Sequence, residues 1–254
     1  MNSCQSDIHE WGRAHQVEFE SSKESLHILC TKNPRGDSFK ILGVRFDTKL
    51  VMYEAVISIV AEAGSRLKML MRCRPFYSVG ALISLYKSHI LSFIESGTPA
   101  YYHAAPSILK LIDGVQDEFL EALGISRKDA ILHFNLAPLC TRRDIAMLGI
   151  LHKVVLGVAF GPFYKLISRC VSSLRSYGFH NGVPFHNKQL QDDVGSCSPV
   201  MLKRSLFGLV FIYNRLPQEI VDAKSVQIFQ RKLQCIVKEV LDVNPKWDLK
   251  FHLV

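Results

Sequence analysis

The sequence has no paired cysteines of the kind that build a metal site or a disulfide framework. Its cysteines number seven, which is odd, and none forms a C-x-x-C pair or another short ligand spacing. This excludes a small zinc module. Most of the cysteines lie in apolar runs, where a free thiol behaves as a small hydrophobic side chain in a reducing compartment.

Long apolar runs are also lacking. The most apolar stretch, 145–167, is broken by five polar or helix-breaking residues: His152, Lys153, Gly161, Pro162 and Lys165. These are too many breaks for a membrane-spanning helix. The N-terminus has neither the basic start nor the apolar core of a signal peptide. We therefore expect no membrane partner and an intracellular location, cytoplasmic or nuclear.

Signatures of catalysis and of metal binding are scarce. There is no G-x-S-x-G motif, so a hydrolase that uses a Ser or Cys nucleophile has no motif in its favour. His180 and His186 lie in a segment rich in Ser, Gly, Asn and Pro. They are candidate metal ligands or ordinary loop residues, and no Cys or carboxylate stands at a matching spacing. We expect no metal site.

The sequence does have an excess of positive charge. In 254 residues, 31 Lys and Arg face 23 Asp and Glu, which gives a net charge of +8 and a pI near 9.1. This balance favours a polyanionic partner such as nucleic acid, although it also serves solubility. The 48% hydrophobic and 21% charged fractions are typical of a globular chain with one large domain or two modest ones.

Apolar residues recur mostly at steps of three and four, which predicts a mainly α-helical protein of antiparallel helical bundles. The core of the prediction is a helical hairpin over 79–124. Further helices are expected over 51–72, over 141–158 behind a capping box of Thr141 and Asp144, and after a cap at Ser225. One small β-hairpin is expected near the N-terminus, over 26–46 with its turn at 33–37.

This pattern divides the chain into four parts. Residues 1–50 carry the β-hairpin, 51–170 form a helical domain, 171–199 read as a loop or linker, and 200–254 form a C-terminal helical segment. Cations crowd the end of the helix over 51–72, namely Arg66, Lys68, Arg72 and Arg74. They form either a solvated face that complements the helix C-terminus or a phosphate-contacting surface. In the second case Lys40, Arg45 and Lys87 could complete one groove.

Several segments, taken in order, resemble the reverse transcriptases of non-LTR (LINE-type) retrotransposons, in the part that follows the polymerase active site. The run FKILGVRFD at 39–47 resembles the strand pair whose Leu-Gly turn, here Leu42 and Gly43, grips the primer end. The run FESSK at 19–23 is similar to a stretch in which a lysine, here Lys23, approaches the incoming nucleotide. LYK at 85–87 and Gln116 resemble the thumb helices. NRLP at 214–217 and SVQIF at 225–229 are similar to a late helical segment.

The resemblance implies an RNA-directed DNA polymerase, with 1–50 as the end of the palm and 51–170 as the thumb. Such chemistry needs paired aspartates that hold two Mg²⁺ ions. The family's Tyr-Ala-Asp-Asp box is absent here, and the one Asp-Asp pair, 192–193, lies in the loop far downstream. We therefore expect no cofactor in this chain, Mg²⁺ being needed only by the complete polymerase.

The resemblance thus predicts a fragment that binds primer–template nucleic acid without polymerising alone, with an upstream polymerase half as a further partner. Lys23 is its one candidate catalytic residue. Its predicted nucleic-acid contacts are Lys40, Leu42, Gly43, Arg45, Arg66, Lys68, Arg72, Arg74 and Lys87. The alternative is a helical domain for protein interaction or structure that does not bind nucleic acid.

Overall fold

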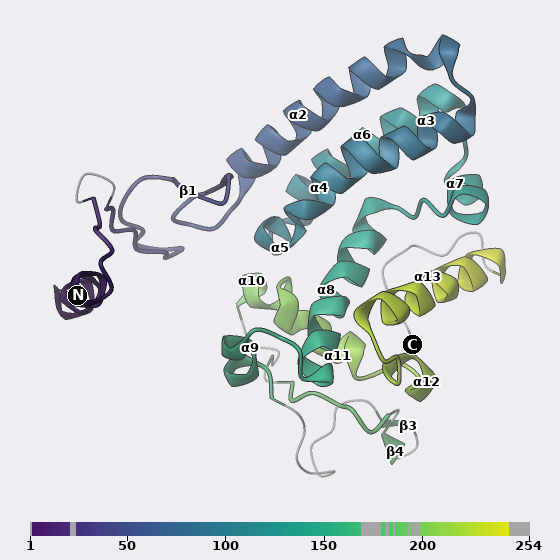
Figure 1. Cartoon of the computed structure of the whole chain (residues 1–254). Coiled ribbons are helices and arrows are strands. Elements are labelled where there is room, and N and C mark those ends of the chain that lie inside the picture. The colour runs from purple at the N-terminus through teal and green to yellow at the C-terminus, as the bar shows by residue number, and fades with distance from the viewer. Residues whose placement is uncertain are drawn as a thin grey trace.

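A computed structural model describes residues 2–20, 24–168, 179–180, 183–184, 186–192, 194 and 199–243. Figure 1 shows an N-terminal arm, a layer of long helices and a C-terminal helical unit. The protein is mainly α-helical with a small β-hairpin near its N-terminus, as the sequence predicts.

The longer helices are α1 (Asn2–Ala14), α2 (Tyr53–Arg72), α3 (Val79–Tyr86), α6 (Pro106–Leu123), α7 (Arg127–Phe134), α8 (Leu139–Leu156) and α13 (Val226–Val243). Short helical pieces are η2 (Arg74–Phe76), η3 (Lys87–Leu91), α4 (Ser92–Ser96), α5 (Thr98–Tyr101), α9 (Gly161–Leu166), α10 (Val200–Lys203), η4 (Leu206–Leu209), α11 (Val210–Tyr213) and α12 (Gln218–Val221). The strands pair as β1 (Phe39–Ile41) with β2 (Val44–Phe46), and as β3 (Phe179–His180) with β4 (Val183–Pro184).

The predicted helical hairpin over 79–124 is confirmed. The first core lies between this hairpin and α2. The first half of the hairpin runs through α3, η3 and α4, and its second half is α6. The segment η3 is a single turn of π-helix, so the first half is not one regular α-helix. Gly124, at a φ of 69°, ends α6 in the left-handed conformation that favours glycine. α2 packs along α6, and buried apolar side chains of both fill the space between them.

The second core joins α8 to the C-terminal helices. Leu148 and Leu151 of α8 are buried together with Phe229 and Leu233 of α13. Ser225 caps α13, its hydroxyl accepting a hydrogen bond from the amide of Ile228 at 3.2 Å, as predicted. Because Leu139 at the start of α8 belongs to the first core, α8 connects the two. The two cores therefore meet within α8.

The β-hairpin is shorter than predicted, and its turn lies elsewhere. The predicted second strand, 39–46, itself folds back at Leu42 and Gly43, so that Lys40 pairs with Arg45. The predicted first strand contributes a single bridge between Ile28 and Arg35. Arg35, within the predicted turn at 33–37, is thus itself a bridge partner, and the turn of the β1–β2 hairpin lies at Leu42 and Gly43.

The expected capping box is wrong. α8 begins at Leu139, with Pro138 in the capping position, so Thr141 and Asp144 do not cap it. Pro fits there because the first turn of a helix leaves its amides without intrahelical partners. On α2, whose apolar periodicity predicts a buried stripe, Tyr53 and Ile57 are exposed. Gly97 and Phe93 line a groove beside them instead of closing over them.

Parts of the predicted loop over 171–199 belong to the second core. Within the described residues it contains the pair β3–β4, which the prediction of a single hairpin missed. Leu190 is fully buried, and the side chain of Asn214 both accepts from its amide, at 2.8 Å, and donates to its carbonyl, at 2.7 Å. Among the described helices, none is long and apolar enough to cross a membrane.

Candidate nucleic-acid interface

A groove of about 750 Å³ lies between the β1–β2 hairpin, the first half of α2 and α4. It brings together four of the predicted contact residues: Lys40, Leu42, Gly43 and Arg45. Its far wall contains Phe93 and Gly97. The hairpin is held here by the ion pair of Arg45 with Glu54 of α2, whose N···O distance is 3.3 Å.

The tip of this hairpin has unusual backbone geometry. Leu42 and Gly43 have φ angles of 50° and 83°, and a two-residue hairpin turn with both central residues at positive φ follows the twist of its strands. Leu42 is 100% exposed, so no packing within the described chain explains a leucine at this strained position. The apolar side chain of Leu42 therefore projects into solvent.

Arg66 is not available as a free cation. It bonds Glu62 one turn earlier at 2.9 Å, donates to the carbonyl of His89 at 3.0 Å, and lies 4.1 Å above the Phe93 ring. These contacts join α2 to η3 and α4. Its predicted role in phosphate binding is therefore less well supported than a structural one.

Lys87 is also used inside the protein. Its ammonium group donates to the carbonyl of Phe134, at the end of α7, and burial lowers the pKa of this lysine. The contact connects the central helices to the segment before α8. The structure thus separates Lys87 from the groove that the sequence assigned to it.

The remaining cations lie at the other end of α2. Lys68, Arg72 and Arg74 are exposed, and within the described chain no acidic side chain forms an ion pair with them. The predicted single groove is therefore wrong. Lys40 and Arg45 lie on the β-hairpin, beside the first turn of α2. Lys68, Arg72 and Arg74 lie three or more helical turns further along the chain.

One face of α2 connects these two ends. Its residues follow at alternating steps of four and three, and all are exposed: Glu54, Ser58, Ala61, Ser65, Lys68 and Arg72. The middle of this α2 face carries only small side chains, so a bulky ligand can approach the helix closely. The spacing is readable in the sequence, but it gives no apolar periodicity because none of its residues is large and apolar.

The other predicted residues do not form a catalytic or metal site in the part of the chain that is described. Lys23 lies outside it, as does one member of the Asp-Asp pair at 192–193. His186 is buried, with Nε2 donating to the carbonyl of Tyr213 and Nδ1 accepting from the amide of Lys188, so it is a structural residue. Among the described side chains no three His, Cys, Asp or Glu residues gather as metal ligands.

The chain matches no protein-family model, and no curated protein or solved structure is significantly similar to it.

Proposed function

We propose that this chain binds the sugar–phosphate backbone of primer–template nucleic acid along α2 and the β1–β2 hairpin. In this proposal it is the thumb-like, C-terminal part of a reverse transcriptase of the retrotransposon kind. The observation that carries it is the exposed α2 face of small residues, which begins at the groove beside Lys40 and ends at Lys68 and Arg72.

The dimensions of the face suit a nucleic-acid strand. From Glu54 to Arg72 it is about 27 Å long, since each helical residue rises about 1.5 Å. One strand of a duplex carries a charge about every 3.4 Å along the axis, so several phosphates fit along this length. The unpaired cations at its ends, Lys40, Lys68, Arg72 and Arg74, would make about three to four contacts. Such contacts position a duplex without reading its sequence.

The chain carries no polymerase activity of its own in this proposal. Support comes from the sequence, whose one Asp-Asp pair lies far from the hairpin that would follow the active site. An upstream polymerase half is the partner that would supply the metal site.

The N-terminal arm, residues 2–20, is consistent with docking against such a partner. Figure 1 shows α1 away from the two helical units, joined to them through the hairpin. Ile8, Trp11 and Phe19 are 49%, 54% and 40% exposed. An amphipathic arm that leaves its large apolar residues uncovered fits a chain that docks against further protein.

The test is the salt dependence of binding to a duplex of arbitrary sequence. Each contacted phosphate contributes about −0.9 to the slope of log affinity against log salt, so three to four contacts give an expected slope of about −2.7 to −3.6. Lys68→Ala/Arg72→Ala should flatten the slope by about two units. The matched control is Lys153→Ala/Lys224→Ala, which removes two exposed lysines from the C-terminal unit.

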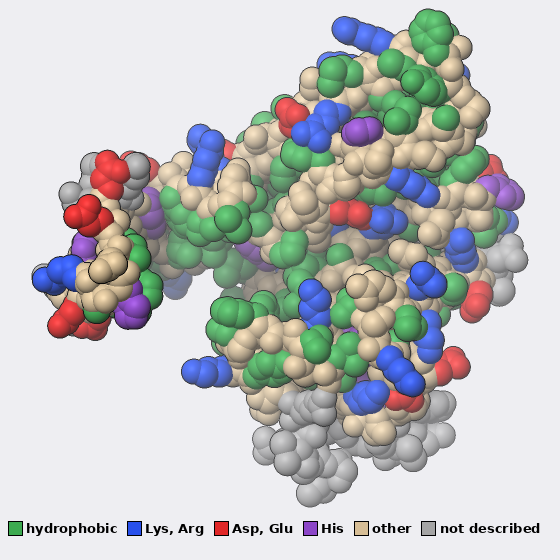
Figure 2. Space-filling view, in the orientation of Figure 1, with side chains coloured by type: hydrophobic (Ala, Val, Ile, Leu, Met, Phe, Trp, Pro, Cys, Tyr) green, Lys and Arg blue, Asp and Glu red, His purple; other side chains and the backbone are tan. Residues whose placement is uncertain are grey.

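A second candidate function is a protein-interaction domain, and a specific surface favours it. Where α2 meets α3, Phe76 is 83% exposed, Met69 58% and Tyr77 50%. In Figure 2 this upper end of the helical layer is covered by apolar side chains with Lys and Arg beside them. Absence of duplex binding, or a slope that Lys68→Ala/Arg72→Ala leaves unchanged, would favour this function over the first.

A further inference from the structure

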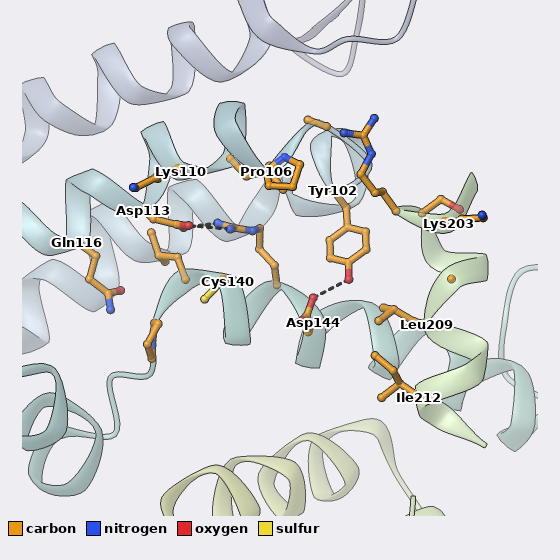
Figure 3. A pocket seen from close by; sticks show the side chains of 18 of the residues that line it. Tyr102, Pro106, Lys110, Asp113, Gln116, Cys140, Asp144, Lys203, Leu209 and Ile212 are labelled. Atoms are coloured by element: carbon orange, nitrogen blue, oxygen red, sulfur yellow. Dashed lines mark hydrogen bonds and ion pairs between the residues drawn. The ribbon is translucent and has the colours of Figure 1, made fainter. Parts of the chain in front are cut away.

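A second cleft, of about 830 Å³, lies between the two cores, and we call it the inter-core cleft. One wall comes from α6 and the start of α8, and the other from α10, η4 and α11. Figure 3 shows Pro106 and Lys110 on the α6 side, opposite Lys203, Leu209 and Ile212. A volume of this size lies within the range of about 300–1,000 Å³ that is common for binding clefts.

The lining between the two walls is largely apolar. Leu109 on one wall and Ile212 on the other are only half-buried, and Phe211, also in the lining, is 41% exposed. The buried side chains of Leu139 and Leu209 complete this apolar interior. No described strand contributes to the lining, so the cleft offers packing against helices and no strand edge for a peptide to pair with.

The C-terminal wall is preformed. α10 and η4 approach so closely that a Cβ on Gly208 would lie 1.8 Å from the carbonyl oxygen of Lys203, so only glycine allows this packing. Arg215 lies 4.0 Å over the ring of Phe211, and each of these side chains holds the other in place. A ligand that binds a preformed wall loses less affinity to ordering.

The charges of the lining are unbalanced. It contains six Lys or Arg residues against three Asp residues, a formal excess of three positive charges. The three carboxylates are already engaged. Asp113 forms a two-pronged ion pair with Arg143, at 2.6 and 3.1 Å, and Asp117 pairs with Arg127 at 2.8 Å. Asp144 accepts a hydrogen bond from a tyrosine hydroxyl at 2.6 Å, the second interaction drawn in Figure 3.

The C-terminal wall supplies cations and no carboxylate. Residues 194–218 contain Lys203, Arg204 and Arg215 but neither Asp nor Glu. Within the described chain no carboxylate forms an ion pair with Arg204 or Arg215, or with Lys110 on the opposite wall. The positive charge is spread over both walls. A ligand with several separate carboxylates therefore complements the cleft better than one with a single anionic group.

We propose that the inter-core cleft binds a short amphipathic helix of a partner protein, which carries large apolar side chains on one face and Asp or Glu beside them. Such a helix lays residues at steps of three and four into an apolar cleft, and its carboxylates meet the cations of the two walls. Nucleic acid fits less well, because its phosphate backbone has no apolar face for the lining. The inference does not rest on the proposed function, since no residue of α2 lines the cleft.

The first experiment selects ligands for the full chain from a displayed library of random peptides of about 14 residues, which is roughly four helical turns. We expect the recovered peptides to combine apolar residues at steps of three and four with several Asp or Glu residues. A fluorescein-labelled synthetic copy should bind the chain in an anisotropy titration. Copies with Asn and Gln for the acidic residues, or with Ser for the apolar ones, should each bind at least about tenfold more weakly.

Charge reversal then locates the peptide. Lys110→Glu/Lys203→Glu reverses one exposed cation on each wall and should weaken binding of the selected peptide at least about tenfold. The matched control, Lys153→Glu/Lys224→Glu, changes the net charge equally at exposed lysines outside the lining and should not. Among copies of the peptide in which one acidic residue at a time becomes Lys, one should bind Lys110→Glu or Lys203→Glu more tightly than the parent chain. A folding defect cannot produce such a rescue.

Three results would overturn the proposal: recovery of no peptide, recovery only of peptides without acidic residues, or equal affinity losses in the cleft variant and its control. A nucleic-acid duplex whose binding falls in Lys110→Glu/Lys203→Glu but not in the control would assign the cleft to nucleic acid instead. The double variant Lys68→Ala/Arg72→Ala should bind the selected peptide as the parent chain does. Failure of this inference is thereby distinguished from failure of the proposed function.

Discussion

Tyr86 and Phe119 stack face to face in the first core, with ring centroids 4.2 Å apart and planes 6° from parallel. The stack joins α3 to α6 at the centre of the helical hairpin, where both side chains are fully buried. Yet the hydroxyl of Tyr86 has no hydrogen-bond partner in the described chain. Burial without a partner raises the pKa of this tyrosine well above its usual value.

We predict that Tyr86→Phe stabilises the protein. An unsatisfied buried hydroxyl costs about 1–3 kcal/mol, and phenylalanine keeps the stacked ring. The free energy of unfolding in urea should rise by about 1 kcal/mol. The matched control is Tyr101→Phe in the same core, because the hydroxyl of Tyr101 donates to the carbonyl of Ile94 at 2.7 Å. The control should lose stability, and a loss in Tyr86→Phe would contradict the prediction.

The buried ion pair of Arg143 and Asp113 should be far more sensitive than an exposed one. Arg143 is 5% exposed, so removal of its carboxylate partner leaves an uncompensated charge. Asp113→Asn is expected to cost about 3–5 kcal/mol in unfolding free energy. Asp117→Asn, which breaks the exposed pair with Arg127, should cost under about 1 kcal/mol. Similar costs for the two variants would show that Arg143 finds another partner.

The strained turn of the β-hairpin offers a stabilising substitution. Leucine at a φ of 50° is unfavourable by about 1–2 kcal/mol, whereas asparagine tolerates this conformation. Since the Leu42 side chain is wholly exposed, Leu42→Asn loses no packing. Amide hydrogen exchange at Ile41 and Val44, the hydrogen-bonded pair that closes the two-residue turn, should slow by up to about tenfold. Faster exchange in the variant would show that Leu42 contributes to the folded hairpin.

The helices were predictable because their apolar periodicity is strong and local. The hairpin over 79–124 and the cap at Ser225 both follow from such patterns. The β-turn was misplaced because FKILGVRF reads as one continuous strand, while 33–37 has typical turn residues. A Leu-Gly pair gives little indication of a turn, since leucine rarely adopts a positive φ.

The candidate site could be predicted only in part, for a different reason. The position of Glu62 four residues before Arg66 already indicated an ion pair on the helix surface. In contrast, the contacts of Arg45 with Glu54 and of Lys87 with Phe134 depend on tertiary packing, which sequence spacing does not encode. Which cations remain free is therefore decided by the fold.

The second core should lose stability in mild acid. His152 and His186 are buried, and burial lowers the pKa of each, with Lys188 adding to the effect and Asp222 opposing it at His186. Their usual pKa is about 6.5, so below that pH the unfolded chain binds protons that the folded chain does not. Stability should therefore be full above pH of about 6.5 and fall as the pH decreases. Urea unfolding between pH 8 and 5 measures this.

His152→Gln provides the diagnostic variant for that acid sensitivity. In the parent chain Nε2 of His152 donates to the carbonyl of Ala223 at 2.9 Å, and Nδ1 accepts from the hydroxyl of Tyr213 at 3.0 Å. Glutamine can donate and accept in the same way without titrating. The variant should show a weaker fall in stability with decreasing pH than the parent chain, whereas His133→Gln, an exposed substitution on α7, should behave as the parent does.

The segment around Leu190 should depend on Asn214 for its attachment to the second core. The amide side chain of Asn214 replaces a strand neighbour, since it donates to and accepts from the backbone of Leu190. Asn214→Ala leaves both buried backbone groups without a partner, at a cost of about 1–3 kcal/mol each.

The nearby Lys188, whose ammonium group bonds the carbonyl of Val221 at 3.1 Å, should then become accessible to trypsin. We expect cleavage after Lys188 to accelerate at least about tenfold, because proteolysis follows the population of the locally opened form. Gln227→Ala, an exposed change on α13, should leave this rate unaltered. Equal cleavage rates in Asn214→Ala and Gln227→Ala would mean that the burial of Leu190, and not its hydrogen bonds, holds the segment.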